Sequence, residues 1–244
     1  MAKKRLDQLL VDRGLVPTRT KALALVMSGQ VYSEGKRLEK GGTSVPDDIH
    51  LEVRGDERPF VSRGGEKLIH AFQHFGLEIE GKRAIDVGSS TGGFTDCLLK
   101  NGALEVTAVD VGTGQLDWNL RNDPRVKVME KFNAREISPE KVGADYDIAV
   151  VDVSFISLEL VLKPVASVVR ESGLILPLVK PQFEAGRAEV SKGKGVIRDP
   201  KTREKTVEKV SNYGISIGLE LVGSVESPIT GPKGNKEYFV LFKQ

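Results

Sequence analysis

The chain has 244 residues, of which 39% are hydrophobic and 29% are charged, and its formal net charge is +2. This composition is that of an ordinary globular protein with room for a small domain and a medium one. Cys97 is the single cysteine, which excludes an internal disulfide, and no Cys and His cluster predicts a metal site. No stretch approaches the roughly 18 apolar residues that span a bilayer, and the Lys-rich N-terminal residues lack the apolar run of a signal peptide, so we expect a cytoplasmic protein.

The first predicted domain comprises residues 1–58 and consists of helices followed by short strands. Leu6, Leu9 and Leu10 share one helical face, and Gly14 ends that helix. Together these elements predict a compact module. In chain order we expect a helix at 3–13, a helix capped by Thr18 and ended by Gly29, a strand at 31–32, a turn at 34–36 and a strand at 50–53.

Positive charge is concentrated in residues 1–42, which carry nine Lys and Arg against four Asp and Glu. This excess favours contact with phosphate groups, and a solvated surface is the alternative. Residues 182–199, rich in glycine and cations, have the composition of a mobile RNA-contacting loop or of an unstructured insertion. The candidates for contact with RNA are Arg5, Arg19, Lys21, Lys36, Arg37, Arg63, Arg187, Lys192 and Lys194.

Residues 59–62 are the predicted interdomain linker, at the end of a polar run, and residues 63–244 form the second domain. Strands and helices alternate along it, which predicts a seven-stranded, mostly parallel sheet covered on both faces. A segment rich in Pro and Gly, 227–236, joins the last two strands, so the last strand should run antiparallel. The expected strands lie at 83–87, 105–110, 126–129, 146–151, 173–179, 220–226 and 237–242, and the expected helices at 66–75, 93–101, 114–121, 157–170 and 201–217.

A glycine-rich turn over residues 86–94 follows the first of these strands, and Asp110 ends the second. Glycines let the backbone approach a ligand closely, and an acid at the second strand end can accept hydrogen bonds from ribose hydroxyls. The glycine spacing is not that of a dinucleotide site and no P-loop lysine is present, so S-adenosylmethionine fits best, with an ordinary tight turn as the alternative. The candidate cofactor-binding residues are Asp86, Gly88, Ser89, Ser90, Thr91, Gly92, Gly93, Phe94, Asp110, Val111, Asn133 and Asp152.

Asn133, after the third strand, could meet the adenine edge of that cofactor or only make a turn. Cys97 lies on the helix after the glycine turn, where it is expected to be a small core residue.

Charged residues are expected to meet at the sheet edge where the parallel strands end. Asp152 and Lys180 each follow a strand, and Glu237 begins the antiparallel last strand. Lys67 begins the helix before the first strand. A ribose 2′-hydroxyl is a poor nucleophile until it loses its proton, and a lysine amine can take that proton. Lys180, with Lys67 nearby, is the predicted base, and the two carboxylates can orient the amines.

Each of these residues also has a simpler interpretation. Asp152 could only help to cap the next helix, and Glu237 could be an exposed strand residue. Lys67 and Lys180 could be surface lysines at the ends of their elements.

Two sets of short sequence blocks carry a family resemblance. The first lies at 5–7, 14–15, 18–19 and 29–31, and the second at 61–65, 86–94, 110–112, 120–125, 152–157, 178–183 and 234–239. Over essentially the whole chain, these blocks resemble the TlyA family, in which an S4-type RNA-binding module is joined to an FtsJ/RrmJ-like methyltransferase. The chain departs from the family pattern at Pro59, in the interdomain motif at 58–61. We expect this proline to stiffen the connection between the two domains.

The resemblance implies a Rossmann-like, S-adenosylmethionine-dependent methyltransferase fold behind a small α+β S4 domain. It implies 2′-O-methylation of a cytidine ribose, with ribosomal RNA or ribosomal subunits as partners and with no metal or membrane. The Lys-Asp-Lys-Glu catalytic set of the family corresponds to Lys67, Asp152, Lys180 and Glu237.

Two alternatives of other classes stay open. Some members of the family are labelled hemolysins, so a membrane-lytic protein is the first alternative, disfavoured because the sequence has no membrane segment. The second is an RNA-binding protein with a degenerate methyltransferase domain, disfavoured because the cofactor turn and the four charged residues are present.

Overall fold

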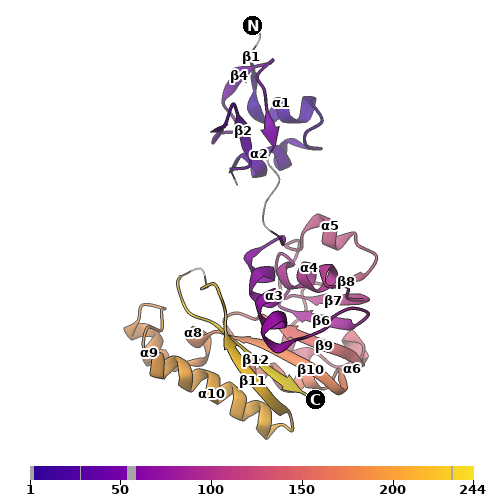
Figure 1. The fold of residues 1–244 in the computed structure, drawn as a ribbon, viewed down its shortest axis with the longest axis vertical. Coiled ribbons are helices and arrows are strands. Elements are labelled where there is room, and N and C mark those ends of the chain that lie inside the picture. Colours follow the sequence, from indigo (N-terminus) through magenta and orange to yellow (C-terminus); the bar gives the residue numbers. More distant parts are fainter. Residues whose placement is uncertain (1–2, 28, 54–58, 232) are drawn as a thin grey trace. The chain divides into compact units, whose positions relative to one another are not determined.

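The structure is a computed structural model that describes residues 3–27, 29–53, 59–231 and 233–244 (Figure 1). Its contacts divide the chain into two compact units, Met1–Pro59 and Phe60–Gln244. Phe60 is buried in the core of the second unit, and the Val61 amide donates a hydrogen bond to Asp96 of that unit at 2.9 Å. Most of the predicted linker 59–62 therefore packs with the second unit, while the polar run at 54–58 lies outside the described residues.

The N-terminal unit packs two helices against short antiparallel strands. Leu6, Leu10 and Val26 are fully buried, as their helical spacing predicts. The pair β1–β4 was not expected, because the residues of β1 are charged and exposed and show no strand pattern. The elements are β1 (Lys3–Arg5), α1 (Leu6–Asp12), α2 (Arg19–Met27), β2 (Val31–Ser33), β3 (Lys36–Arg37), β4 (Ser44–Pro46) and β5 (Glu52–Val53), with β2 between β3 and β5.

The second unit is built on a seven-stranded sheet in the order β11-β12-β10-β9-β6-β7-β8. Neighbours from β10 to β8 are parallel, whereas β12 is antiparallel to both β10 and β11, which confirms the expected direction of the last strand. The start of β12 therefore lies at the edge where the parallel strands end. The strands are β6 (Arg83–Val87), β7 (Glu105–Val109), β8 (Val126–Met129), β9 (Tyr146–Val151), β10 (Val169–Val179), β11 (Glu220–Glu226) and β12 (Tyr238–Lys243).

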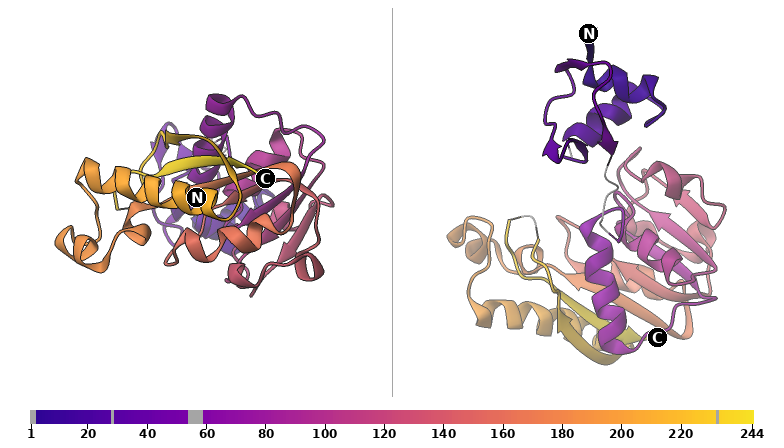
Figure 2. Two further views of the ribbon diagram at one scale, coloured as in Figure 1. Left: turned by 90° about the horizontal axis from the view of Figure 1, so that it is seen from below. Right: turned by 45° about the horizontal axis from the view of Figure 1, so that its top comes forward.

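Helices cover both faces of this sheet (Figure 2). Because side chains alternate along a strand, Ile148 and Val150 of β9 pack under α3 and α4, whereas Ala149 and Val151 pack on the side of α7 and α10. This confirms the α/β class with a doubly covered sheet. The helices are α3 (Arg63–Phe75), α4 (Gly93–Lys100), α5 (Trp118–Arg121), η1 (Ala134–Glu136), α6 (Pro139–Val142), η2 (Leu158–Leu160), α7 (Leu162–Ala166), α8 (Pro181–Glu184), α9 (Arg187–Lys192) and α10 (Pro200–Ser216).

Three sequence-based expectations are wrong in detail. The helix expected at 157–170 is divided into η2 and α7 and stops early, because Val169 already pairs with β9. The helix expected at 114–121 is the single turn α5, which Asp117 caps by accepting a hydrogen bond from the Asn119 amide. The loop expected at 182–199 instead contains the short helices α8 and α9.

Candidate active site

The four charged residues predicted at the sheet edge form two ion pairs. Lys67 Nζ lies 2.6 Å from Glu237 Oε2, and Lys180 Nζ lies 2.5 Å from Asp152 Oδ1. Lys67 is 8% exposed, Lys180 9% and Glu237 1%, so neither lysine is a surface residue. Ser157, and not Asp152, accepts the hydrogen bond that caps the next helical turn. The simpler interpretations of these residues are therefore wrong.

Lys67 is positioned by a close approach between the first turns of α3 and α4. Ser62 caps α3 by accepting a hydrogen bond from the Gly64 amide at 3.3 Å. A Cβ atom at Gly65 would lie 2.2 Å from the ring of Phe60, and one at Gly93 would lie 2.1 Å from Ser62 Oγ. Glycine at position 93 lets the two helices meet, and glycine at position 65 leaves room for Phe60. Lys67 follows Gly65 by two residues in α3.

The turn after β6 also depends on glycine. Gly88 and Gly92 have φ angles of +90° and +95°, which L side chains rarely adopt. A Cβ atom at Gly88 would lie 2.6 Å from the carbonyl oxygen of Asp152. The turn therefore passes directly beside the loop that follows β9 and brings the cofactor candidates next to the charged residues.

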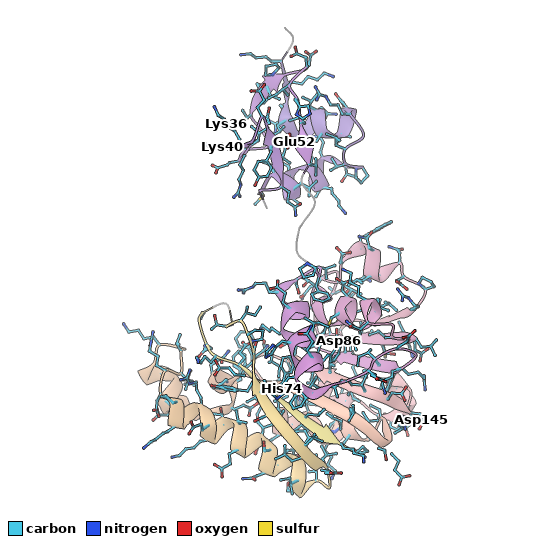
Figure 3. The ribbon with its side chains drawn as sticks, in the orientation of Figure 1. Lys36, Lys40, Glu52, His74, Asp86 and Asp145 are labelled. Carbon is cyan, nitrogen blue, oxygen red and sulfur yellow. The ribbon has the colours of Figure 1, made fainter. Side chains whose placement is uncertain are left out.

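Asp86, at the end of β6, is fully buried in the sheet (Figure 3). Its Oδ2 accepts a hydrogen bond from Thr95 Oγ1 at 2.7 Å, and its Oδ1 has no hydrogen-bond partner among the described residues. Burial raises the pKa of Asp86 to about 7. An unpartnered, buried carboxylate oxygen is suited to a cationic ligand such as the amino group of S-adenosylmethionine.

Asp110, directly after β7, joins the glycine-rich turn to its own loop. Its two carboxylate oxygens accept hydrogen bonds from the backbone amides of Ser90 at 2.8 Å and Gly112 at 2.7 Å. Each oxygen keeps a second lone pair, so ribose hydroxyls can still donate to it. The Phe132 amide donates to the Asp110 carbonyl at 3.0 Å, which brings the loop of Asn133 to the same place.

A cavity of about 320 Å³ lies between the glycine-rich turn and the ion pairs.

Two of the cofactor candidates have other surroundings. Asn133 caps η1 by accepting a hydrogen bond from the Arg135 amide at 3.1 Å, which is the turn role considered for it, and Val111 is 75% exposed. The cofactor candidates that line this cavity are Gly88, Ser89, Ser90, Thr91, Gly93, Phe94 and Asp152, and those that do not are Asp86, Gly92, Asp110, Val111 and Asn133.

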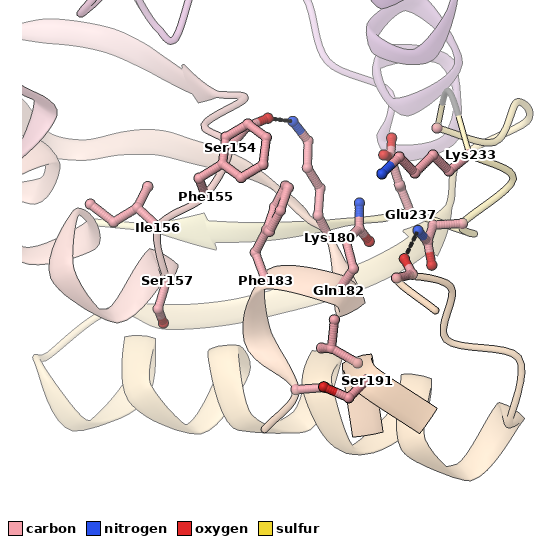
Figure 4. Close-up of a pocket in the computed structure, with 15 residues that line it drawn as sticks. Ser154, Phe155, Ile156, Ser157, Lys180, Gln182, Phe183, Ser191, Lys233 and Glu237 are labelled. Carbon is pink, nitrogen blue, oxygen red and sulfur yellow. Dashed lines mark hydrogen bonds between the residues drawn. The ribbon is translucent and has the colours of Figure 1, made fainter. Parts of the chain in front are cut away.

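A larger cavity, about 810 Å³ in volume, adjoins Lys180 and Ser154 (Figure 4). Phe155 and Phe183 form one wall, with their ring centroids 4.9 Å apart. Phe155 is 91% exposed and has a φ angle of +63°, an unfavourable conformation for a residue with a side chain. Ser154, Lys180 and Glu237 line both cavities.

Ser154, Phe155 and Phe183 were not predicted as site residues. The sequence feature that could have indicated them is their position, two or three residues after Asp152 or Lys180 at the strand ends. Neither aromatic residue could be distinguished from a core residue by spacing alone.

The RNA-contact candidates divide into several groups. Arg5 and Arg19 both donate to the buried Asp7, at 2.8 Å and 3.0 Å, and hold its pKa well below the ordinary value. They therefore stabilise the N-terminal unit, although each side chain stays about half exposed. Arg63 lines the smaller cavity. Exposed candidates are Lys21, Lys36, Arg37 and Lys194, whereas the side chains of Arg187 and Lys192 lie outside the described ones.

The described residues show two further features relevant to function. No helix among them is long and apolar enough to cross a membrane. In the same part of the chain, no group of three or more His, Cys, Asp or Glu side chains could hold a metal ion. Cys97 is buried in the core, as expected, and burial raises the pKa of its thiol.

The fold and the site define a class of protein, an α/β methyltransferase domain that follows a small S4 unit. The profile of the FtsJ-like methyltransferase family matches residues 60–244, and that of the S4 domain matches residues 4–47.

Comparison with individual proteins narrows this class. The chain is 46% identical to the 16S/23S rRNA (cytidine-2′-O)-methyltransferase TlyA of Mycobacterium tuberculosis, over 98% of this chain and 90% of the relative. A solved structure from Streptococcus thermophilus that carries a hemolysin label is 42% identical, with a TM-score of 0.75 over 100% of this chain and 89% of that one. An S-adenosylmethionine-dependent methyltransferase from Mesorhizobium loti, 14% identical, shares the fold with a TM-score of 0.51 over 72% and 96% of the two chains. The chain belongs to the TlyA family of FtsJ-like methyltransferases.

Proposed function

We propose that this protein transfers a methyl group from S-adenosylmethionine to the 2′-oxygen of a cytidine ribose in ribosomal RNA. The observation that carries the proposal is that Ser154, Lys180 and Glu237 line both cavities. A methyl donor in one cavity and a nucleotide in the other would meet beside these residues. The similarity to a cytidine-2′-O-methyltransferase over nearly the whole chain supports this choice of acceptor.

The residues that line the smaller cavity, together with Asp86 and Asp110 behind its glycine-rich turn, fit S-adenosylmethionine. Asp86 offers a buried oxygen without a partner, which suits the ammonium of the methionine part, and Asp110 can accept from the ribose hydroxyls. Asp152 lines the same cavity and offers a negative charge to a sulfonium. When bound, S-adenosylmethionine supplies an electrophilic methyl group, and the electron pair of the broken carbon–sulfur bond returns to sulfur.

Lys180 is the proposed base. Its amine takes the proton of the ribose 2′-hydroxyl as the oxygen forms its bond to the methyl carbon, and the proton later leaves to solvent. Asp152 contacts the Lys180 amine, while Glu237 holds the Lys67 ammonium beside the same edge. Most of the rate enhancement should come from alignment of the acceptor oxygen with the methyl group, with assistance from the base.

The larger cavity is the proposed nucleotide site. Phe155 and Phe183 present ring faces on which a base can stack, and such a contact contributes about 1–3 kcal/mol per base. The target nucleotide would have to leave its own stack to reach Lys180. Exposed cations of the S4 unit, such as Lys36, would bind phosphates elsewhere on the RNA. The proposal makes ribosomal RNA or a ribosomal subunit the partner, and the cytoplasm the location.

The test is a methyl-transfer assay with purified protein, labelled S-adenosylmethionine and ribosomal subunits from a strain that lacks the modification. We expect label on a cytidine 2′-oxygen, and a loss of about 100-fold or more in Lys180→Ala. Calorimetry with S-adenosylmethionine, run on both proteins, separates binding from transfer. Cofactor binding without transfer to either subunit would overturn the proposal in favour of an RNA-binding protein with an inactive methyltransferase domain.

A further inference from the structure

Ser154 lies between the two cavities and contacts the side chain of the proposed base. Its Oγ accepts a hydrogen bond from Lys180 Nζ at 2.8 Å (Figure 4). Asp152 Oδ1 lies 2.5 Å from the same nitrogen, as an ion pair. Lys180 is almost buried, whereas Ser154 is exposed and lines both cavities. One hydrogen-bond acceptor, Ser154, and one carboxylate, Asp152, thus approach the amine from the same loop at the place where the cavities meet.

We propose that Ser154 is a positioning residue that, together with Asp152, sets the direction of the lone pair of Lys180. The inference rests on the proposed function, in which the neutral Lys180 amine is the base. A neutral amine has two N–H bonds and one lone pair in a tetrahedral arrangement. Lys180 donates one N–H to Ser154, whereas its contact with Asp152 is an ion pair and not a hydrogen bond. When the negative charge of Asp152 draws the second N–H and repels the lone pair, the lone pair has a single remaining direction.

Asp152 alone does not determine that direction. With the ion pair to Asp152 as its only contact, the amine can rotate about its Cε–Nζ bond and place either an N–H or its lone pair toward the reacting hydroxyl. Only one of these orientations accepts a proton. Removal of the Ser154 hydroxyl should therefore reduce kcat by about 10-fold, a typical cost of lost orientation, without changing cofactor binding.

Ser154 should also affect the pH at which the base works. Its oxygen accepts from the ammonium more strongly than from the amine, because hydrogen bonds to charged groups are stronger. Without it, the half-maximal pH of kcat should move lower by about 0.5 to 1 unit. The charged groups around Lys180, which stay in place in the variant, are Arg63, Lys67, Asp152, Lys233 and Glu237.

The loop that carries Ser154 is held without its side chain. Buried Glu184 of α8 accepts hydrogen bonds from Ser157 Oγ at 2.7 Å and from the Leu158 amide at 2.8 Å. These bonds join the loop after β9 to the helix that follows Lys180. Ser154→Ala should therefore fold normally.

The experiment compares Ser154→Ala, Ser154→Thr and Ser216→Ala with the wild-type protein. Ser216 is exposed at the end of α10 and lines neither cavity, so it is the matched control for loss of a hydroxyl. The assay measures kcat against pH on ribosomal subunits, and calorimetry measures S-adenosylmethionine affinity. We expect Ser154→Ala to lower kcat about 10-fold and shift its half-maximal pH downward, Ser154→Thr to restore both, and Ser216→Ala to change neither.

The possible failures are distinguishable. An inactive wild-type protein would contradict the proposed function itself. An active wild-type protein with an unchanged pH profile in Ser154→Ala would contradict the positioning role alone. A lower kcat with the same half-maximal pH, not restored by threonine, would mean that Ser154 only shapes the cavity, which also overturns the inference.

Discussion

One fully buried aspartate in each unit illustrates how the same side chain serves two purposes. Asp7 and Asp86 are both 0% exposed. Asp7 accepts from Arg5 and Arg19, which lower its pKa. Within the described part of the chain, Asp86 accepts from Thr95 alone, and burial raises its pKa to about 7. A buried carboxylate whose cations are built into the fold stabilises that fold. One left without a cation among the described residues is, in the proposed function, the partner of a cationic ligand.

The two residues also have opposite effects on stability against pH. In the folded protein the pKa of Asp86 lies above the ordinary value of 3.8. Its contribution to the free energy of unfolding is therefore fully present below about pH 4 and is lost as the pH rises to about 7. In the folded protein the pKa of Asp7 is lowered. Its contribution to the free energy of unfolding is therefore present above about pH 4 and is lost as the solution becomes more acidic than that.

The largest expected effect is on cofactor affinity in Asp86→Asn. The variant keeps the size of the side chain and an acceptor for Thr95 but loses the charge. We expect S-adenosylmethionine to bind about 10- to 100-fold more weakly, as for loss of a charge-assisted hydrogen bond, by calorimetry at pH 7.5. Asp7→Asn is the matched control, with unchanged affinity.

Denaturation experiments show whether Asp86→Asn is folded. Without cofactor at pH 8, the variant should be more stable than the wild-type protein, because it carries no buried carboxylate. If Asp86→Asn bound the cofactor as tightly as the wild-type protein does, the distinction between the two aspartates would be wrong.

A smaller effect is expected from pH. A carboxyl group with a pKa of about 7 must lose its proton to hold an ammonium, so affinity should fall with acidity. Between pH 7 and pH 5.5 we expect a decrease of about 10-fold, which titration calorimetry in buffers of different ionisation enthalpy can measure together with proton release. The decrease should be absent in Asp86→Asn. A wild-type affinity that does not change over this range would show that Asp86 is already ionised without the cofactor.

The smallest effect is expected from Asp7→Asn at neutral pH. Arg5 and Arg19 would lose their shared carboxylate, but both are about half exposed and water would solvate them. We expect a local loss of about 1 kcal/mol, seen as faster amide hydrogen exchange in α1 and α2 without change in α3 or α4. Unchanged exchange in α1 would mean that Asp7 does not stabilise this unit.

Much of the fold was predictable because most residues of its central strands are apolar. Residues 83–87 and 126–129 and the strand at 146–151 have the predicted bounds in the structure. The four charged residues were predictable for a related reason, since the carboxyl ends of parallel strands meet at one edge. The helix at 157–170 was not, because the early pairing of Val169 with Tyr146 is a long-range contact that overrides local helical spacing.

The sequence by itself determined the alternation of elements, the glycine turn and the charged residues at the strand ends, because these follow from periodicity and from backbone geometry. Only the tertiary structure decided which charges pair with which. It assigned Arg5 and Arg19 to Asp7, left Asp86 without a cation among the described residues, and placed Ser154 against Lys180. Burial and pairing depend on residues far apart in the chain, and no local pattern records them.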